Sequence, residues 1–283
     1  CCLANPFLGH EAEPLEKAEE PKKVMVIGGG VAGLSAAFIA KERGHEVTLY
    51  EAGDVLGGNM RLAAYPPGKG DITNMIRSYI HRCQKDGVKI VMNCEVTPEL
   101  IKEEKPDSVI IATGSKTLIL PIEGIDNPAI IHGSDLLDGK RAAGKKVLVV
   151  GGGMVGCETA AFLGEQEHDV TVIEFRDTVG ADVIHEHRVY LMKDFEDYGI
   201  KEITGAKVCK FYEDGVEYET ADGVRHESRG YDSVILSMGF RNYNPLEEKI
   251  KDLVPETHVI GDAIRARRAL DATKEAYEVA SRI

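Results

Sequence analysis

The chain has 283 residues, and because domains usually contain about 100 to 200 residues, this length predicts two of them. Asp and Glu number 47 against 34 Lys and Arg, which gives a net charge of −13 at pH 7. Such a charge repels nucleic acid phosphates and anionic lipids alike. No segment has the roughly 18 uninterrupted apolar residues of a membrane helix. We therefore expect neither nucleic acid nor a membrane as a partner.

The six cysteines lack the spacing of a disulfide framework, and no secretory signal peptide precedes the first predicted strand. These observations favour a cytoplasmic protein without structural disulfides. The chain begins with Cys1-Cys2 instead of methionine, which indicates the tail of a longer protein. Residues 7 to 23 are highly charged and contain two prolines, so residues 1 to 23 are predicted to form a connector before the first domain.

A strand, a glycine-rich turn and a helix open the first predicted domain. Residues 24 to 27 are apolar and mostly β-branched, as in a buried strand, and glycines follow at 28, 29, 30 and 33. Residues 34 to 43 then predict a helix that ends at Gly44, and residues 46 to 50 predict a second strand, followed directly by Glu51.

The same order of elements recurs further along the chain. Residues 146 to 150 predict a strand, glycines follow at 151, 152, 153 and 156, a helix extends to about Glu165, and residues 170 to 173 predict a strand before Glu174. The first glycines of the two copies are 123 positions apart, as are the two acids, and residues 107 to 114 match residues 232 to 239. Strands that alternate with helices predict an α/β fold with two Rossmann-like domains, each built on a mostly parallel sheet.

Three further segments complete the predicted organisation. Residues 115 to 145 form the crossover between the two copies. Residues 208 to 218 and 224 to 228 flank Asp222-Gly223, a dipeptide typical of hairpin turns, and predict two paired strands. Residues 258 to 260 predict a last strand, which leads through Gly261-Asp262 to a final helix from about Ala269.

The glycine turns have the spacing of a dinucleotide-binding fingerprint. Gly28, Gly30 and Gly33 follow a strand, open a helix and precede an acid, Glu51, 23 positions after the first glycine. The first glycine permits a tight turn, the second lets the backbone approach a pyrophosphate, and the third allows close contact between helix and strand. The helix N-terminus attracts the pyrophosphate, and Glu51 would accept hydrogen bonds from a ribose. Glycines that merely end a strand would explain neither the acid nor the repeat.

The second fingerprint consists of Gly151, Gly153 and Gly156 with Glu174. An acid at the ribose position repels a 2′-phosphate, so we favour NADH over NADPH as the nucleotide of this site. Arg176 leaves an alternative open, because it could reach a 2′-phosphate instead of remaining solvated.

Two nested fingerprints in one chain resemble the two-dinucleotide-binding flavoproteins, in which the first site holds FAD and the second holds a nicotinamide. The resemblance includes Ala37 and Gly44 after the first fingerprint, the segment Ala112-Thr113-Gly114, and Gly261-Asp262. It implies that residues 24 to 115 and 255 to 283 form the FAD-binding domain. The NAD(P)H-binding domain, residues 120 to 240, would then be inserted into the first.

The resemblance also assigns individual residues to the two nucleotides. Asp262 would bind the ribityl and phosphate region of the flavin, although Gly-Asp by itself predicts only a turn. The FAD-binding residues would be Gly28, Gly30, Val31, Ala32, Gly33, Glu51, Gly57, Gly58, Ala112, Thr113, Gly114, Gly261 and Asp262. The NADH-binding residues would be Gly151, Gly153, Met154, Val155, Gly156, Glu174 and Gly239.

Three further features have two interpretations each. Glu158 stands where this family often has a glutamate near the nicotinamide and flavin rings, but a solvated glutamate in the first turn of a helix is equally compatible. Cys157 is either a buried small residue or a thiol activated by the helix N-terminus. Arg265, Arg267 and Arg268 could reach a pyrophosphate or an acidic partner, with at least two of them expected to be solvated.

The segment Cys2-Leu3-Ala4-Asn5-Pro6, continued by Gly9-His10-Glu11, resembles the last cluster-ligand segment of iron-sulfur flavoenzymes similar to 2,4-dienoyl-CoA reductase, enoate reductase and trimethylamine dehydrogenase. Pro66-Pro67-Gly68-Lys69 is a second resemblance to this subgroup. It implies a missing N-terminal FMN barrel and a four-iron cluster, with Cys2 as the fourth thiolate ligand and Cys1 as its neighbour. Two cysteines cannot supply four thiolates, so we expect no cluster on this chain alone. An inert terminal cysteine is the alternative.

By this resemblance the chain is the electron-input module of an enoate-reductase-like or 2,4-dienoyl-CoA-reductase-like enzyme. Hydride would pass from NADH to FAD, and electrons would continue to the iron-sulfur cluster and to FMN in the missing barrel. No Cys-x-x-Cys or Cys-x-x-x-x-Cys pair is present, which argues against a disulfide reductase. The alternatives are a structural module that holds ADP or FAD without hydride transfer, and a free-standing NADH oxidase or diaphorase. An oligomer is compatible with the sequence.

Overall fold

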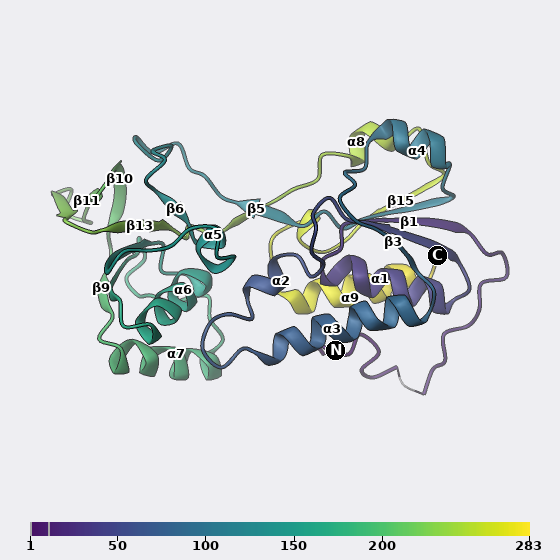
Figure 1. The fold of residues 1–283 in the computed structure, drawn as a ribbon, viewed down its shortest axis with the longest axis horizontal. Coiled ribbons are helices and arrows are strands. Elements are labelled where there is room, and N and C mark those ends of the chain that lie inside the picture. The colour runs from purple at the N-terminus through teal and green to yellow at the C-terminus, as the bar shows by residue number, and fades with distance from the viewer. Residues whose placement is uncertain (1, 11) are drawn as a thin grey trace. The chain divides into compact units, whose positions relative to one another are not determined.

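The computed structural model describes residues 2–10 and 12–283, which form two compact units (Figure 1). The first contains the chain up to Ala64, Asp71–Lys116 and Arg241–Ile283, and the second contains Tyr65–Gly70 and Thr117–Phe240. Each unit has a five-stranded parallel sheet of its own. The second unit is therefore inserted into the first, and the predicted α/β fold with two Rossmann-like domains is confirmed.

The sheet of the first unit is built around strand β1, Lys23–Ile27, in the order β15-β4-β1-β2-β3. The central strands are almost continuously apolar, as expected for parallel strands covered on both faces. Because side chains alternate along a strand, Val24 and Val26 pack into one buried cluster, and Met25 and Ile27 pack into another. The other strands are β2 (Glu46–Tyr50), β3 (Lys89–Val91), β4 (Ser108–Ile111) and β15 (Glu256–Val259).

Helices cover both faces of this sheet (Figure 1). On one face Ala36 and Ala40 of the first helix share a buried cluster with Ala276, and these small residues let the first and last helices pack closely. On the other face Ile101 and Ile250 fill the cluster around Met25. The first face carries α1 (Val31–Glu42), α3 (Asp71–Lys85) and α9 (Ala269–Ala280), and the second carries α4 (Pro98–Glu104) and α8 (Glu247–Ile250).

The second unit repeats the plan of the first. Its sheet has the order β6-β13-β7-β8-β9, so β13-β7-β8-β9 corresponds to β4-β1-β2-β3. Val147 and Val149 pack with the helices, whereas Leu148 and Val150 pack with Phe211 of an antiparallel meander. The strands are β6 (Ile131–His132), β7 (Lys146–Val150), β8 (Asp169–Ile173), β9 (Lys201–Ile203) and β13 (Ser233–Leu236), and the helices are α5 (Gly133–Leu137), α6 (Met154–Glu165) and α7 (His185–Asp197).

The meander has three strands, β10 (Lys207–Tyr212), β11 (Gly215–Glu219) and β12 (Arg225–Arg229). The prediction of one continuous strand over residues 208 to 218 is therefore wrong. Glu213 and Asp214 form a second turn, because Tyr212 pairs directly with Gly215 across these two residues. The Asp214 carboxylate accepts hydrogen bonds from Arg229 Nε at 2.6 Å and from the Gly230 amide at 3.2 Å, which holds this turn against the third strand.

Helix α1 begins at Val31, three residues earlier than predicted. Gly30 is its extended N-cap residue, so the helix N-terminus lies at the second glycine of the fingerprint rather than after the third.

The remaining elements are the short helix α2 (Asn59–Leu62), the 3-10 turn η1 (Gly261–Ala263), and the paired strands β5 (Ser115–Thr117) and β14 (Phe240–Asn242), where the chain passes between the units. Within the described residues, no helix is both long and apolar enough to cross a membrane.

We predict that acid destabilises the first unit through His45. The ring is fully buried, and its Nδ1 accepts a hydrogen bond from the Lys22 amide at 3.0 Å. Burial, together with the positive charges of Arg43 and Lys22, lowers the pKa of His45 below its usual 6.5. The unfolded chain therefore takes up a proton more readily than the folded chain, and the contribution of His45 to stability is lost as the pH falls below about 6.5.

Urea unfolding at pH 7.5 and at pH 5 measures this effect. His45→Gln should lose less stability between the two pH values than the wild type, because its side chain does not titrate. His10→Gln, at an exposed site, is the control and should behave like the wild type. An equal acid loss in His45→Gln and in the wild type would contradict the prediction.

Candidate functional site

The glycine turn of the first unit is shaped by two contacts with backbone carbonyls. A Cβ atom on Gly28, which has φ +109°, would lie 2.3 Å from Ala112 O, and one on Gly33 would lie 1.9 Å from Gly28 O. Neither position tolerates a side chain. A Cβ on Gly30, by contrast, would meet no described atom within 4 Å. The backbone at the N-terminus of α1 is thus open to a ligand, as a pyrophosphate site requires.

Glu51 holds this turn in place through two hydrogen bonds, and we call an acid with this role a clamp. Its Oε2 accepts a hydrogen bond from the Gly29 amide at 2.7 Å, and its Oε1 accepts one from the Gly53 amide at 2.7 Å. A carboxylate has about four acceptor positions, so two remain for the hydroxyl groups of a ribose. Glu51, which we predict to bind a ribose, therefore also positions the turn.

The loop after β2 lies directly on the turn. The Gly57 amide donates to Gly29 O at 2.8 Å, and a Cβ on Gly58 would lie 3.2 Å from the Cα of Gly30. The Ala112 amide donates to Ile27 O at 2.8 Å and joins the end of β4 to the start of the turn. The structure thus brings together the glycines of the fingerprint, Gly57 and Gly58 of the loop after β2, and Ala112 at the end of β4, all of which were predicted.

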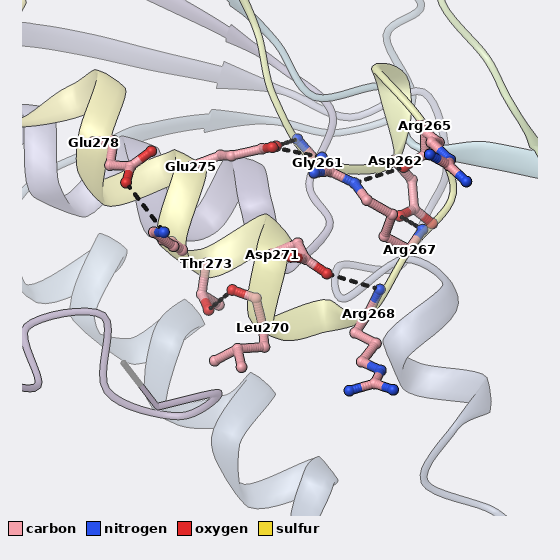
Figure 2. Close-up of polar contacts among 11 residues, drawn as sticks. Gly261, Asp262, Arg265, Arg267, Arg268, Leu270, Asp271, Thr273, Glu275 and Glu278 are labelled. Carbon is pink, nitrogen blue, oxygen red and sulfur yellow. Dashed lines mark hydrogen bonds and ion pairs between the residues drawn. The ribbon is translucent and has the colours of Figure 1, made fainter. Parts of the chain in front are cut away.

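The last part of the first site comes from residues near the end of the chain, which Figure 2 shows. The Gly261 amide donates to Glu275 Oε2 at 2.7 Å, and Arg267 pairs with Glu275 Oε1 at 2.5 Å. Asp262 Oδ1 accepts from the Arg267 amide at 3.0 Å, and its Oδ2 accepts from Ser115 Oγ at 2.9 Å. Glu275 and Ser115 were missed by sequence reasoning, because neither belongs to a motif and only the fold places them beside Asp262.

Arg265, Arg267 and Arg268 are all exposed, which agrees with the expectation that at least two of them are solvated. Arg267 is nevertheless held by its ion pair with Glu275. Gly261 also packs on the first helix, because a Cβ at this position would lie 3.1 Å from the Cβ of Ala32. The Gly261-Asp262 turn is therefore held at the N-terminus of α1, where the FAD-binding residues were predicted.

The second unit repeats the glycine turn and its clamp. A Cβ on Gly151 would lie 2.4 Å from Ser237 O, and one on Gly156 would lie 1.8 Å from Gly151 O. Glu174 Oε2 accepts from the Gly152 amide at 2.6 Å, and Oε1 accepts from the Arg176 amide at 2.9 Å. These contacts correspond one to one with those of Gly28, Gly33 and Glu51.

A pocket of about 270 Å³ opens at this second turn. Six of the seven predicted NADH-binding residues line it, and the seventh, Gly156, is buried in the contact with Gly151. Sequence reasoning missed Phe175, which is 68% exposed, and Asp182, whose Oδ1 accepts from the Met154 amide at 2.9 Å. The lining residues are Val150, Gly151, Gly153, Met154, Val155, Ile173, Glu174, Phe175, Arg176, Asp182, Ala206, Val208, Ser237, Met238 and Gly239.

Glu158 is buried within α6, with a side chain that is 7% exposed, and it forms an ion pair with Lys69. A solvated glutamate is therefore the wrong interpretation of this position. Lys69 belongs to the segment Pro66-Pro67-Gly68-Lys69, which groups with the second unit although the chain on both sides of it belongs to the first. A buried carboxylate needs such a partner, because an uncompensated charge is strongly destabilising.

Cys157 is fully buried, and its thiol donates to Gly152 O at 3.2 Å. Burial raises the pKa of Cys157 to about 12, so its surroundings outweigh any activation by the helix N-terminus.

Cys2 is half-buried, and Cys1 lies outside the described residues. The segment after Cys2 is anchored on the first unit: Tyr79 Oη donates to Leu3 O at 3.2 Å, and Phe7 stacks on Phe38. Among the described residues, no group of three or more His, Cys, Asp and Glu side chains could hold a metal ion.

We predict opposite tolerance at two glycines of the first turn. Gly33→Ala should destabilise the folded chain by about 3 kcal/mol or more, because its methyl group would overlap the Gly28 carbonyl. Gly30→Ala should cost about 1 kcal/mol, the usual difference between glycine and alanine at an N-cap. Urea unfolding of both variants without nucleotide measures the difference. Similar losses in the two variants would show that the contact at Gly33 is not the constraint that we infer.

We also predict that the cysteines differ in reactivity. Burial raises the pKa of both Cys83 and Cys157 to about 12, so both thiols stay protonated and unreactive at pH 8. Iodoacetamide should modify the half-buried Cys94 and Cys209 in the native protein, and it should modify Cys83 and Cys157 only in denaturant. Peptide mapping by mass spectrometry reads out each site. Rapid native modification of Cys157 would overturn its assignment as a buried structural thiol.

Comparison with known proteins identifies the family. The model of the pyridine nucleotide-disulphide oxidoreductase family matches residues 22–260. Cinnamate reductase of Clostridium sporogenes is 35% identical to this chain over 286 residues, which cover 100% of the chain and 42% of that protein. NADH oxidase of Thermoanaerobacter brockii is 34% identical over 290 residues, covering 100% of this chain and 44% of that protein. A solved structure of 2-naphthoyl-CoA reductase superposes with a TM-score of 0.94 at 33% identity, covering 100% of this chain and 43% of that one.

The chain therefore spans less than half the length of these relatives. The relatives confirm the resemblance to enoate-reductase-like flavoenzymes, and the family model indicates binding of FAD and of a nicotinamide nucleotide. The duplicated glycine turns, the acid clamps and the match over both units together show that this chain belongs to the pyridine nucleotide-disulphide oxidoreductase family.

Proposed function

We propose that this chain is the NADH-accepting part of a flavin-dependent reductase, with FAD on the first unit and NADH on the second. The observation that carries the proposal is the repeated cradle. In each unit a glycine turn ends at a helix N-terminus, and an acid from the next strand binds the turn through a backbone amide. Two such cradles in one chain support two dinucleotides, which a protein that holds a single ADP would not need.

The first unit has the groups that FAD requires. The open backbone at Gly30 and the N-terminus of α1 would receive the pyrophosphate, and Glu51 has free acceptor positions for a ribose. Asp262, held by Ser115 and the Arg267 amide, would contact the ribityl and phosphate region. FAD, when bound, supplies a ring that accepts two electrons from a reduced nicotinamide.

In the second unit the charge of Glu174 supports NADH over NADPH. Its carboxylate lines the pocket and would repel a 2′-phosphate on the ribose that it is expected to bind. Arg176 also lines the pocket, but the contact between these two residues runs from the Arg176 backbone amide to Glu174. Two backbone amides therefore hold the Glu174 carboxylate at the turn, where it lines the pocket.

Glu158 remains our candidate for a contact with the nicotinamide, and Lys69 is the residue that positions it. The Lys69 ammonium compensates the buried carboxylate and holds it in one orientation. Removal of Lys69 would leave the buried Glu158 carboxylate without its counter-charge. Both residues are described within the second unit.

We further propose that the complete protein is a reductase of unsaturated acids or thioesters. The relatives include a cinnamate reductase and a 2-naphthoyl-CoA reductase, each more than twice as long as the matched segment. The segment that begins at Cys2 fits the last ligand segment of an iron-sulfur cluster, in line with its resemblance to the iron-sulfur flavoenzymes. An FMN-bearing barrel and the cluster would then receive the electrons that enter through this chain.

Anaerobic titration of the FAD-reconstituted chain tests the input step. NADH should bleach the flavin absorbance at about 450 nm, and NADPH should do so at concentrations at least about tenfold higher, because one charge repulsion is worth on the order of one power of ten. Glu174→Gln should narrow that difference on the order of tenfold. Asp177→Asn, an exposed acid of the same loop, is the matched control.

Three results would contradict the proposal. Absence of FAD binding would exclude the flavin role of the first unit. Tight FAD binding without bleaching by either nucleotide would leave a nucleotide-holding module. Equal use of NADH and NADPH by the wild type would remove the role assigned to Glu174.

A further inference from the structure

The loops that follow the second strand of each repeat are attached in the same way. In the first unit the Gly57 amide donates to Gly29 O at 2.8 Å, and in the second the Gly180 amide donates to Gly152 O at 2.7 Å. Gly57 and Gly180 are 123 positions apart, which is the spacing of the fingerprints themselves. The two loops can therefore be compared residue by residue from this point.

Beyond this shared contact the two loops differ at the helix N-terminus. In the first unit Gly58 lies against Gly30 and adds no side chain there. Asn59 follows, and its amide is directed to Ser115, with Nδ2 at 3.2 Å from the Ser115 hydroxyl. The corresponding position of the second unit, 123 residues later, is Asp182.

Asp182 takes the place that a bound anion would take in the second unit. Its Oδ1 accepts a hydrogen bond from the Met154 amide at 2.9 Å, and its Oδ2 would lie 3.3 Å from a Cβ on Gly153. The Met154 amide is one of the first-turn donors of α6 that have no partner within the helix. The partial positive charge of the helix N-terminus favours an anion at this point. Asp182 is exposed and lines the pocket, so its side chain has room to leave.

We propose that Asp182 is an internal substitute for the pyrophosphate of the nicotinamide nucleotide, and that it weakens nucleotide binding. The inference rests on the proposed function of the second unit. A nucleotide must displace the carboxylate from the Met154 amide and then share the helix N-terminus with its negative charge. Among the described residues of the first unit, Gly58 and Asn59 stand in its place and bring no carboxylate to the helix N-terminus. The two cradles are thereby suited to different tasks: one retains its nucleotide, and the other releases it after each turnover.

Anaerobic calorimetry of NADH binding to the chain whose FAD has already been reduced with dithionite, so that the nucleotide binds without reacting, tests the proposal. Asp182→Asn keeps the size and the capping oxygen but removes the charge, and we expect NADH to bind about tenfold more tightly, the effect of one removed charge repulsion. Asp182→Ala removes the cap as well. It should also tighten NADH binding, and at the same time lower the urea midpoint of the nucleotide-free chain. A higher NADH affinity together with a lower stability identifies a competing cap, because a loss of fold would lower both the affinity and the stability. Asp177→Asn removes the same charge from the same loop away from the pocket lining and should leave the affinity unchanged.

The outcomes separate this inference from the proposed function. Unchanged or weaker NADH binding in Asp182→Asn, with normal binding by the wild type, would overturn the inference alone and would make Asp182 neutral or a nucleotide ligand. An equal increase in NADH affinity in Asp177→Asn would also overturn the inference, because the effect would then come from the net charge of the loop and not from the position of Asp182. Absence of NADH binding in the wild type and in both Asp182 variants would overturn the proposed function and the inference together. FAD content should be the same in all variants, since Asp182 belongs to the second unit.

Discussion

In both units the third glycine of the turn lies against the carbonyl of the first, so closely that a Cβ atom would come within 2 Å of that oxygen, at 1.9 Å for Gly33 and 1.8 Å for Gly156. This contact brings the first turn of the helix against the end of the central strand. It thereby places the free amides of the helix N-terminus beside the end of the sheet, where α/β folds bind their ligands. The acid clamps, the neighbouring loops and the pocket of the second unit are all arranged around this contact.

The acid after the second strand connects the turn to the rest of the sheet. Glu51 and Glu174 each accept a hydrogen bond from the amide of the middle residue of the turn, at 2.7 Å and 2.6 Å. A residue that appears from its spacing to be a nucleotide ligand is thus also a structural support. Loss of the carboxylate would alter the shape of the turn together with its charge, which is why a conservative amide is the informative substitution.

The two repeats share one backbone plan but carry different charges. Position 35 is a buried serine in the first unit, whereas its counterpart Glu158 forms an ion pair with Lys69. Asn59 contacts Ser115, whereas its counterpart Asp182 caps helix α6. Both differences add acid to the second unit at positions near the nucleotide cradle. Duplication preserved the packing that every such cradle needs, and the electrostatic differences would adapt each copy to its own nucleotide.

The amino-acid sequence by itself determined the duplicated α/β plan, because the glycines and acids act locally: Gly28, Gly33 and Glu51 lie within one strand-turn-helix-strand unit, as do Gly151, Gly156 and Glu174. It also led to six of the fifteen residues that line the pocket. It failed at the turn of Glu213 and Asp214, which lies inside residues 208 to 218, predicted as one strand.

Only the tertiary structure decided which distant residues complete the sites. Glu275 supports Gly261, Lys69 neutralises Glu158, and Asp182 reaches Met154 across 28 positions. These are single side chains on separate elements, and no motif or period indicates their partners, although Lys69 itself belongs to the Pro-Pro-Gly-Lys segment. Their contacts exist only once the sheets and helices have packed. Local pattern therefore specified the two cradles, whereas packing specified their electrostatic surroundings.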